Sequence, residues 1–261
     1  MITAEQLYDR LNAFAPFSTA LEGDGVGLLV GAPDDPVERV AVALDATRQT
    51  VLAALEAGCQ LLLTHHPLYF GLFADQPADS AAMLAAQSGL AVLCAHTNLD
   101  AAPGGVSDCL AVRLGLRDVS PLGLPDQPIP MARVGALSAP DAASLARLAG
   151  EKLGVSGVKF TPCDGPVSTV AVCGGSGGDF LTAARQAGAQ ALVTGESKHH
   201  LRLLARELGV ALIECGHFCT ERPVTDVLAV LAEGAGAAVV RLSERDPAEY
   251  LPIGEVSERA L

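Results

Sequence analysis

Two series of short apolar runs, separated by helix-like segments, constrain the fold of this chain more than any other feature. In one series the first run begins at Val40 and the second ends at Thr64. In the other they begin at Val170 and end at Thr194, so each pair of runs spans the same 24 positions. Each series then continues through a helical segment and a glycine into a third run, at 90–95 and 210–215. Runs of this length between helical segments predict buried parallel strands joined by crossover helices.

The parallel between the two series predicts an α/β protein of two related lobes with mainly parallel strands. The alternative is that all βαβ units look alike, without duplication. The predicted N-terminal lobe spans residues 1–120 and the C-terminal lobe 131–261. Between them, residues 121–130 hold four prolines without helical periodicity, which is typical of a linker.

Smaller patterns place several further elements. Thr3 and Gln6 fit a helix capping box. After the linker, residues 131–137 read as a strand and 140–153 as a helix, while a C-terminal helix is expected from Pro223 to Glu233, ending at Gly234. The tail from Ser243 onward is polar and charged.

Composition and charge limit the class of protein. Half of the 261 residues are hydrophobic and 18% are charged, enough for a large core. The net charge of −13 and the lack of a basic stripe argue against a nucleic-acid surface, but metal ions could supply local positive charge for a small anionic substrate. Seven cysteines without a Cys-x-x-Cys, no signal peptide and no membrane span predict a cytoplasmic protein with reduced thiols.

All the histidines follow apolar, strand-like runs. They are His65, His66, His96, His199, His200 and His217. Strand C-termini are where open α/β sheets build their sites, and imidazole with carboxylate suits zinc, iron and similar divalent ions. The sequence therefore predicts a metal protein, with the histidine-rich strand ends of the two lobes facing each other across a metal-binding cleft.

Spacing selects the candidate ligands. Neighbours in an extended segment point to opposite faces, but the His65–His66 pair at a strand-to-loop turn can serve two metals. His217 and Glu221 would share one face if a helix begins there, and a carboxylate can bridge two ions. Asp100 follows His96 by four positions, with an N-cap or Asx turn as the alternative for this loop start.

Other polar residues at the strand ends are candidates for catalysis or substrate binding. His96 could be a ligand, could orient a ligand, or could act as a general acid or base. Glu196 could orient ligands, bind substrate or act as a base, and Lys198 could contact a phosphate. His199 and His200 fit the start of a surface helix at the rim of the site.

The glycine run 174–178 and the cysteines near His217 are weaker signals. Backbone N–H groups around Ser176 could hold an anion, although a tight turn explains the run equally well. Cys219 is expected to be buried or beside the ligands, with soft metal ligation or redox sensitivity as the alternative.

Six segments together resemble the dinuclear-metal-centre family of GTP cyclohydrolase I type 2 homologues, also named after the yeast NGG1-interacting factor. They are Gly27–Gly31, Thr64–Phe70, His96–Asp100, Gly174–Gly177, Thr194–Glu196 and Gly216–Glu221. The resemblance covers nearly the whole chain in the same motif order. It implies a two-lobed α/β unit without the domain that some members insert between the lobes, assembled into a homohexamer.

The resemblance also implies a ligand set for two divalent ions per chain. Its members would be His65, His66, Asp100, His217 and Glu221, with Glu221 as the bridge. Two departures from the family pattern, Gly25 after Asp24 where Asn is common and Phe218 where Tyr is common, touch no ligand. Zinc, iron, manganese, cobalt and nickel are not distinguished by such ligands.

Two functions of different kinds fit this reading. The first is a dinuclear metal-dependent hydrolase of a nucleotide or related phosphorylated small molecule. In such an enzyme, a hydroxide shared between two metals could open the ring of GTP or cleave a phosphoester. The second is a non-enzymatic metal-binding, regulatory or metal-handling oligomer, favoured by the lack of an identifiable nucleophile or substrate motif. An open coordination position would fit catalysis, and a closed shell would fit structure.

Overall fold

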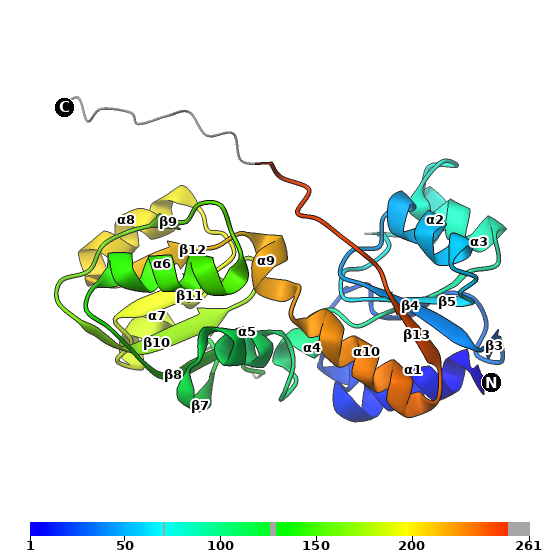
Figure 1. Cartoon of the computed structure of the whole chain (residues 1–261), viewed down its shortest axis with the longest axis horizontal. Helices are drawn as coiled ribbons and strands as arrows, with labels where there is room; N and C mark the ends of the chain where they lie inside the picture. The colour runs from blue at the N-terminus through cyan, green and yellow to red at the C-terminus, as the bar shows by residue number, and fades with distance from the viewer. Residues whose placement is uncertain (70, 126–128, 250–261) are drawn as a thin grey trace.

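The computed structural model describes residues 1–69, 71–125 and 129–249 and consists of two α/β lobes that lie side by side (Figure 1). Each lobe is built on its own sheet, and each sheet has a core of consecutive parallel strands. This architecture confirms the predicted fold class.

The first lobe holds a five-stranded sheet in the order β13-β4-β5-β6-β2. Strands β13, β4, β5 and β6 are parallel, and β2 runs antiparallel to β6. A separate antiparallel pair, β1 with β3, lies beside it. The strand bounds are Ile2–Thr3 (β1), Gly27–Val30 (β2), Pro36–Val37 (β3), Arg39–Ala43 (β4), Leu61–Thr64 (β5), Ala91–Cys94 (β6) and Ala238–Arg241 (β13).

Helices cover both faces of this sheet because its strands are apolar on both sides. Val40 and Val42 of β4 pack toward α1 (Ala4–Phe14) and α10 (Val224–Ala235). Ala41 and Ala43, which point the opposite way, pack toward α2 (Arg48–Glu56) and α3 (Ala81–Gln87). Thr3 and Gln6 form the predicted capping box at the start of α1.

The second lobe repeats this three-layer arrangement around a six-stranded sheet in the order β7-β8-β10-β11-β12-β9. Strands β10, β11 and β12 are parallel, and the other pairings are antiparallel. The strand bounds are Arg117–Leu122 (β7), Ala132–Ala139 (β8), Lys159–Phe160 (β9), Val167–Cys173 (β10), Ala191–Thr194 (β11) and Ala211–Glu214 (β12).

The helices of the second lobe divide between the two faces of its sheet. Helices α5 (Val106–Leu114) and α6 (Ala142–Leu153) pack on one face, and α7 (Leu181–Gln186) and α8 (His199–Leu208) on the other. The β10-β11-β12 core matches β4-β5-β6 in order and direction, as the equal spacing predicts.

The chain passes between the lobes at places other than residues 121–130. Helix α5 already packs on the second sheet, while α10 and β13 return to the first, where β13 pairs with β4. Residues 121 and 122 of the predicted linker belong to β7 (Arg117–Leu122), and residues 126–128 lie outside the described residues. Helix α10 also ends two residues later than expected, with Gly236 in the left-handed conformation.

Two short helices, α4 (Thr97–Ala101) and α9 (His217–Glu221), lie between the lobes (Figure 1). Asp100 is therefore in a helical turn rather than at a loop start. The buried Arg133 guanidinium on β8 donates to both carboxylate oxygens of Asp108 at 2.8 Å, and to the carbonyl of Ala102. This network fixes α4 and α5 against the second sheet. Three 3₁₀ turns, Phe17–Thr19, Phe73–Asp75 and Gly178–Phe180, complete the described structure.

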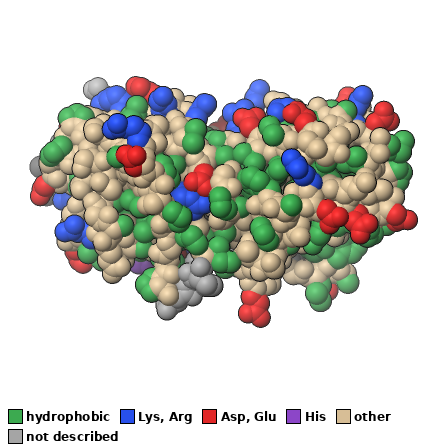
Figure 2. Space-filling view, turned by 90° about the horizontal axis from the view of Figure 1, so that it is seen from below, with side chains coloured by type: hydrophobic (Ala, Val, Ile, Leu, Met, Phe, Trp, Pro, Cys, Tyr) green, Lys and Arg blue, Asp and Glu red, His purple; other side chains and the backbone are tan. Residues whose placement is uncertain are grey.

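The surface carries charges of both signs. On the face drawn in Figure 2, Lys and Arg side chains are scattered among Asp and Glu rather than gathered, and hydrophobic side chains are most frequent across the middle. None of the helices in the described residues is long and apolar enough to span a membrane.

Candidate metal centre

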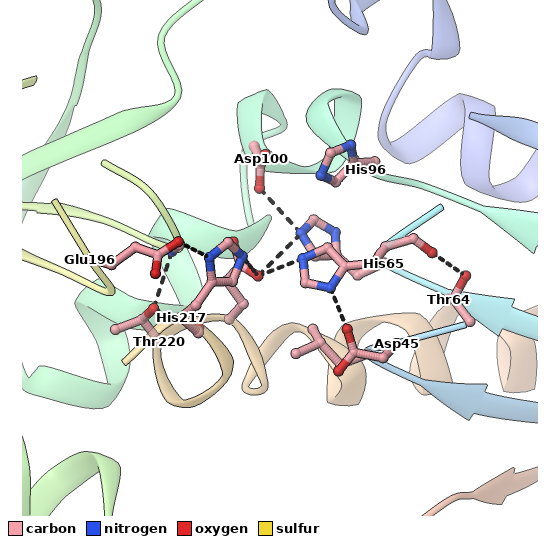
Figure 3. A network of polar contacts seen from close by, with 12 residues as sticks. Asp45, Thr64, His65, His96, Asp100, Glu196, His217 and Thr220 are labelled. Atoms are coloured by element: carbon pink, nitrogen blue, oxygen red, sulfur yellow. Dashed lines mark hydrogen bonds and ion pairs between the residues drawn. The ribbon is translucent and has the colours of Figure 1, made fainter. Parts of the chain in front are cut away.

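Strand ends from both sheets converge on one cluster between the lobes. His65 and His66 directly follow β5, and Asp100 lies on α4, just after β6. From the second lobe, α9 contributes His217 and Glu221 one helical turn apart. Figure 3 shows the side chains of the two lobes pointing toward one another. All five predicted ligands therefore lie together.

One carboxylate oxygen lies at the centre of this cluster. Oε2 of Glu221 is 2.8 Å from Nε2 of His66 and 3.0 Å from Nε2 of His217. Nε2 of His65 lies 3.9 Å from the same oxygen and 3.6 Å from Oδ1 of Asp100. Gly175 makes room for this arrangement, because a Cβ at that position would overlap the Glu221 carboxylate.

In every clustered imidazole, Nδ1, the ring nitrogen on the other side from Nε2, faces an oxygen atom. The Nδ1 partners are Ala95 O for His65 (2.9 Å), Asp45 Oδ1 for His66 (2.7 Å), Asp24 Oδ1 for His96 (2.7 Å) and Glu196 Oε1 for His217 (3.1 Å). A neutral imidazole so placed keeps its proton on Nδ1 and presents the Nε2 lone pair, the form in which histidine binds metals.

The geometry leaves two buried atoms that need a cation. Among the described residues, Nε2 of His65 and Oε2 of Glu221 have no hydrogen-bond partner while the imidazoles are neutral, although the distances from Oε2 to two imidazole nitrogens are short. With the protons on Nδ1, each short approach brings two lone pairs together. Unpartnered buried polar atoms are costly, and a divalent ion among these donors would satisfy them. The donor set therefore fits a metal.

The pKa of His65 is lowered, whereas those of His66 and His217 are raised. Burial lowers the pKa of His65 to about 3, against the attraction of Glu221, so this imidazole is neutral. Burial also lowers the pKa of His66, but hydrogen bonds to Asp45 and Glu221 outweigh it and raise the pKa to about 10. The hydrogen bond to Glu221 likewise raises the pKa of His217 to about 9, despite burial.

The carboxylates of the cluster respond to the same contacts. Burial favours the neutral form of Glu221, but His217 and His66 outweigh it and hold the pKa of this carboxyl well below its ordinary value. Burial, followed by the charge of Glu221, raises the pKa of Asp100 above its ordinary value. Without metal, protons on His66 and His217 supply the positive charge that Glu221 attracts.

The ligand atoms form three overlapping sets, each within 4.8 Å. These are His65 with His66 and His96; His66 with His217 and Glu221; and His65 with Asp100 and Glu221. The last two sets share only Glu221, so this carboxylate lies where it could contact one ion in each set.

His96 is held by an aspartate that the sequence analysis did not assign to the site. Asp24 accepts from the backbone N–H and hydroxyl of Thr97 as well as facing His96 Nδ1. Burial opposes ionisation, but the hydrogen bonds to His96 and Thr97 lower the pKa of Asp24 to about 2. Asp45 holds His66 in the same way. Aspartates after glycine or strand residues are common in turns, so sequence gave no distinguishing signal for either.

A cavity of about 200 Å³ opens beside the cluster. Its lining residues are His96, Asp100, Ser107, Met131, Cys173, Gly174, Ser176, Phe180, His217 and Glu221. A larger hollow of about 740 Å³ lies on the other face of α9 and is lined by none of the clustered histidines or carboxylates. The smaller cavity is therefore the approach to the site, because His96, Asp100, His217 and Glu221 line it.

Two backbone N–H groups of the glycine-rich turn donate hydrogen bonds to threonine hydroxyls from other segments of the protein. The N–H of Gly175 donates to Thr220 Oγ1, and that of Gly177 donates to Thr194 Oγ1. These two groups are not free for an anion, which supports the tight-turn interpretation. Ser176 itself is exposed and lines the cavity.

The remaining candidates lie at the rim. Glu196, with its side chain 60% exposed, contacts His217 and is positioned to orient it. Lys198, His199 and His200 are exposed at the start of α8, as expected for the histidines, and belong to none of the ligand sets. Cys219 is partly buried beside the first core, and burial raises the pKa of its thiol.

Comparisons with known proteins match most of this chain to one family and to named relatives. A model of the family described as Duf34/NIF3 (NGG1p interacting factor 3) matches residues 2–247. A Streptomyces coelicolor protein named GTP cyclohydrolase 1 type 2 homolog is 37% identical over 232 residues, covering 84% of this chain and 81% of that protein. A Clostridium acetobutylicum protein of the same name is 29% identical, covering 90% and 91% respectively.

Solved structures show the same fold. The Staphylococcus aureus hypothetical protein SA1388 superimposes with a TM-score of 0.86 at 26% identity, covering 95% of this chain and 99% of that one. A Bacillus cereus protein related to NIF3 has a TM-score of 0.83 at 21% identity, covering 96% and 99%.

Proposed function

Because the chain belongs to the Duf34/NIF3 family, we propose that it is a dinuclear metal-dependent hydrolase of a nucleotide or a related phosphorylated small molecule. The observation that carries this proposal is the meeting of His66, His217 and Glu221 across the two lobes, beside an open cavity. A purely structural site would be expected to have its ligands enclosed on all sides.

The five residues His65, His66, Asp100, His217 and Glu221 would hold two divalent ions, with Glu221 between them. Bound ions would supply Lewis acidity and activate water for attack on a phosphorus or ring carbon. They would also compensate the charge of an anionic substrate in a protein with a net charge of −13.

The neighbouring residues of the chain have distinct roles in this proposal. His96, held through Nδ1 by Asp24, lines the cavity and can accept or donate a proton at Nε2. Glu196 orients His217 through its Nδ1. Ser176 and Lys198 are the proposed substrate contacts, Ser176 in the cavity wall and Lys198 at the exposed rim.

The cavity constrains how a substrate would bind. A volume of about 200 Å³ is below the range of about 300–1,000 Å³ usual for whole-ligand pockets. We therefore infer that the reacting group enters the cavity while the remainder of the molecule extends over the rim. GTP is the first substrate to test, because relatives carry the name GTP cyclohydrolase 1 type 2 homolog.

Assembly into a homohexamer is part of the same proposal. It comes from the family resemblance of the six sequence segments, and sedimentation of the purified protein would test it.

Turnover by metal-loaded protein tests the activity. The protein would be stripped by a chelator, reloaded separately with Zn²⁺, Mn²⁺, Fe²⁺, Co²⁺ or Ni²⁺, and assayed against GTP, other nucleotides and phosphoesters. We expect turnover that His65→Ala abolishes without unfolding the protein. Metal binding without turnover on any of these substrates would contradict the hydrolase and favour a metal-handling or regulatory role.

A further inference from the structure

The segment after β13 lies beside the turn at residues 44–45, although the two are far apart in sequence. Strand β13 pairs in parallel with β4, and the pairing continues one step further, where the N–H of Leu242 donates to the carbonyl of Val42 at 2.9 Å. The chain after Leu242 is therefore held alongside the residues that follow β4, which lead to Asp45.

Beyond the end of this backbone pairing, the side chain of Glu244 binds the backbone that follows β4. Its Oε2 accepts from the N–H of Leu44 at 2.6 Å, and its Oε1 accepts from the N–H of Asp45 at 3.0 Å. One carboxylate thus satisfies two consecutive backbone donors at the end of β4. Hydrogen bonds to a charged acceptor are stronger than those between neutral groups, so the turn at residues 44–45 is held firmly.

The turn that Glu244 holds is the support of His66. Oδ1 of Asp45 lies 2.7 Å from Nδ1 of His66, and the N–H of His66 donates to the carbonyl of Leu44 at 2.8 Å. Both the ring and the backbone of His66 are therefore fixed by residues 44 and 45. Loss of a carboxylate that orients a ligand histidine typically weakens metal binding about 10- to 100-fold.

His65 and His96 have supports that do not depend on the C-terminal segment. The carboxylate facing His96 is fixed by Thr97, the next residue along the chain, and His65 faces the backbone carbonyl of Ala95. His66 differs, because the turn at residues 44–45 that supports it is held by Glu244, about 200 positions further along the chain.

The same segment also reaches the second lobe. The carboxylate of Asp246 lies 3.6 Å from where a Cβ would stand on Gly216, the residue before His217. Residues 242–246 therefore run from the edge of the first sheet to the start of α9, past the turn that supports His66.

We propose that Glu244 is a positioning residue of the metal centre, acting through Asp45 to hold His66 in its ligand orientation. This inference rests on the proposed metal centre and adds to it a residue from the C-terminal segment. Because Glu244 touches no ligand atom itself, its loss is expected to weaken metal binding rather than abolish it.

Cobalt binding to the full chain tests the proposal directly. Co²⁺ would be titrated into metal-free protein against a chelator of known affinity, with its visible absorption reporting the ligands. We expect Glu244→Ala to weaken the more sensitive of the two Co²⁺ sites about 10-fold, near the lower end of outer-ligand effects, and to change the spectrum. Glu244→Gln, which retains one acceptor oxygen, should lie between Ala and wild type. Glu249→Ala is the matched control, because Glu249 is an exposed acid on the same segment.

A double-mutant cycle separates positioning from general destabilisation. If Glu244 acts through Asp45, Glu244→Ala should have little further effect on Co²⁺ affinity in an Asp45→Ala background. Equal and additive losses in both backgrounds would overturn the proposal, as would wild-type affinity and spectrum in Glu244→Ala. If Glu244→Ala does not fold, the cycle is run with Glu244→Gln and judged by the same rule.

The test distinguishes this inference from the proposed function. Wild-type protein that binds no Co²⁺ would refute the metal centre itself and, with it, any role for Glu244. If wild-type protein binds Co²⁺ and Glu244→Ala has the same Co²⁺ affinity and spectrum, only the positioning role is refuted.

Discussion

Oε2 of Glu221, from the second lobe, lies 2.8 Å from Nε2 of His66, from the first. The strands that precede these residues, β5 and β12, belong to different sheets, and the contact exists only because the two sheets present their strand ends to each other. The site is thus a product of lobe packing, and changes that loosen the packing should affect the site even when they touch no ligand.

Removing the charge of the shared carboxylate should cause the largest loss of metal. In Glu221→Gln an amide replaces the anionic oxygen that faces both His66 and His217. We expect affinity for Zn²⁺ or Co²⁺ to fall by more than the 10- to 100-fold typical of residues that only support ligands. Competition titration measures this, with the exposed Glu207→Gln as control. Equal affinities in the two variants would contradict a bridging role.

The stability of the metal-free protein should fall at alkaline pH. The pKa of His66 is raised to about 10 and that of His217 to about 9, both above the ordinary 6.5. Their protonation therefore contributes fully to the free energy of unfolding below about pH 6.5, and the contribution is lost as pH rises through 9–10. Metal must displace the same protons, so apparent metal affinity should rise with pH over this range.

Denaturant titrations at pH 7, 8, 9 and 10 check the pH dependence. The decline should be smaller in His66→Gln, whereas the exposed His200→Gln should behave like wild type. A metal-free protein whose stability stays constant or increases from pH 7 to 10 would contradict the protonated cluster.

Asp24 should matter for turnover more than for metal content. In Asp24→Asn the amide cannot accept from both Thr97 and His96 as the carboxylate does, so the His96 ring loses its fixed orientation. We expect turnover of the substrate found by the nucleotide assay to drop about 100-fold, the lower range for general acid–base groups, with an altered pH profile. The exposed Asp9→Asn is the control. Unchanged turnover with metal retained would remove His96 from the mechanism.

Arg133 should be the most sensitive charged residue of the scaffold. Its guanidinium is 3% exposed and pairs with both oxygens of Asp108. Arg133→Ala leaves that carboxylate and several carbonyls without their donor, at a cost of about 3–5 kcal/mol. Chemical denaturation would measure this against the exposed Arg147→Ala, for which a change within about 0.5 kcal/mol is expected. A loss in Arg133→Ala no larger than in the control would contradict its anchoring role.

The central strands, and the residues that meet at their ends, could be predicted because their signals are local. The runs at 61–64 and 191–194 are continuous apolar segments, which parallel strands buried on both faces require. The histidines at their ends, and the four-residue spacing of His217 and Glu221, needed only the position of each strand to be interpreted.

The partners of these residues could not be predicted, because they depend on contacts between distant segments. Asp45 and Glu244 are ordinary acidic residues in sequence, and their roles arise only when β13 returns to pair with β4. Nothing local in residues 238–241 specifies which sheet they join. The placement of α5 on the second sheet was hidden for the same reason.

Metal content of the purified protein tests the central claim most directly. Wild-type protein and Glu221→Gln would be stripped, reloaded with Zn²⁺, dialysed exhaustively and analysed for metal per chain. We predict two tightly held ions in wild type and the loss of tight binding of both ions in Glu221→Gln. Wild-type protein that retains no ion after dialysis would contradict a metal centre at the junction of the two lobes.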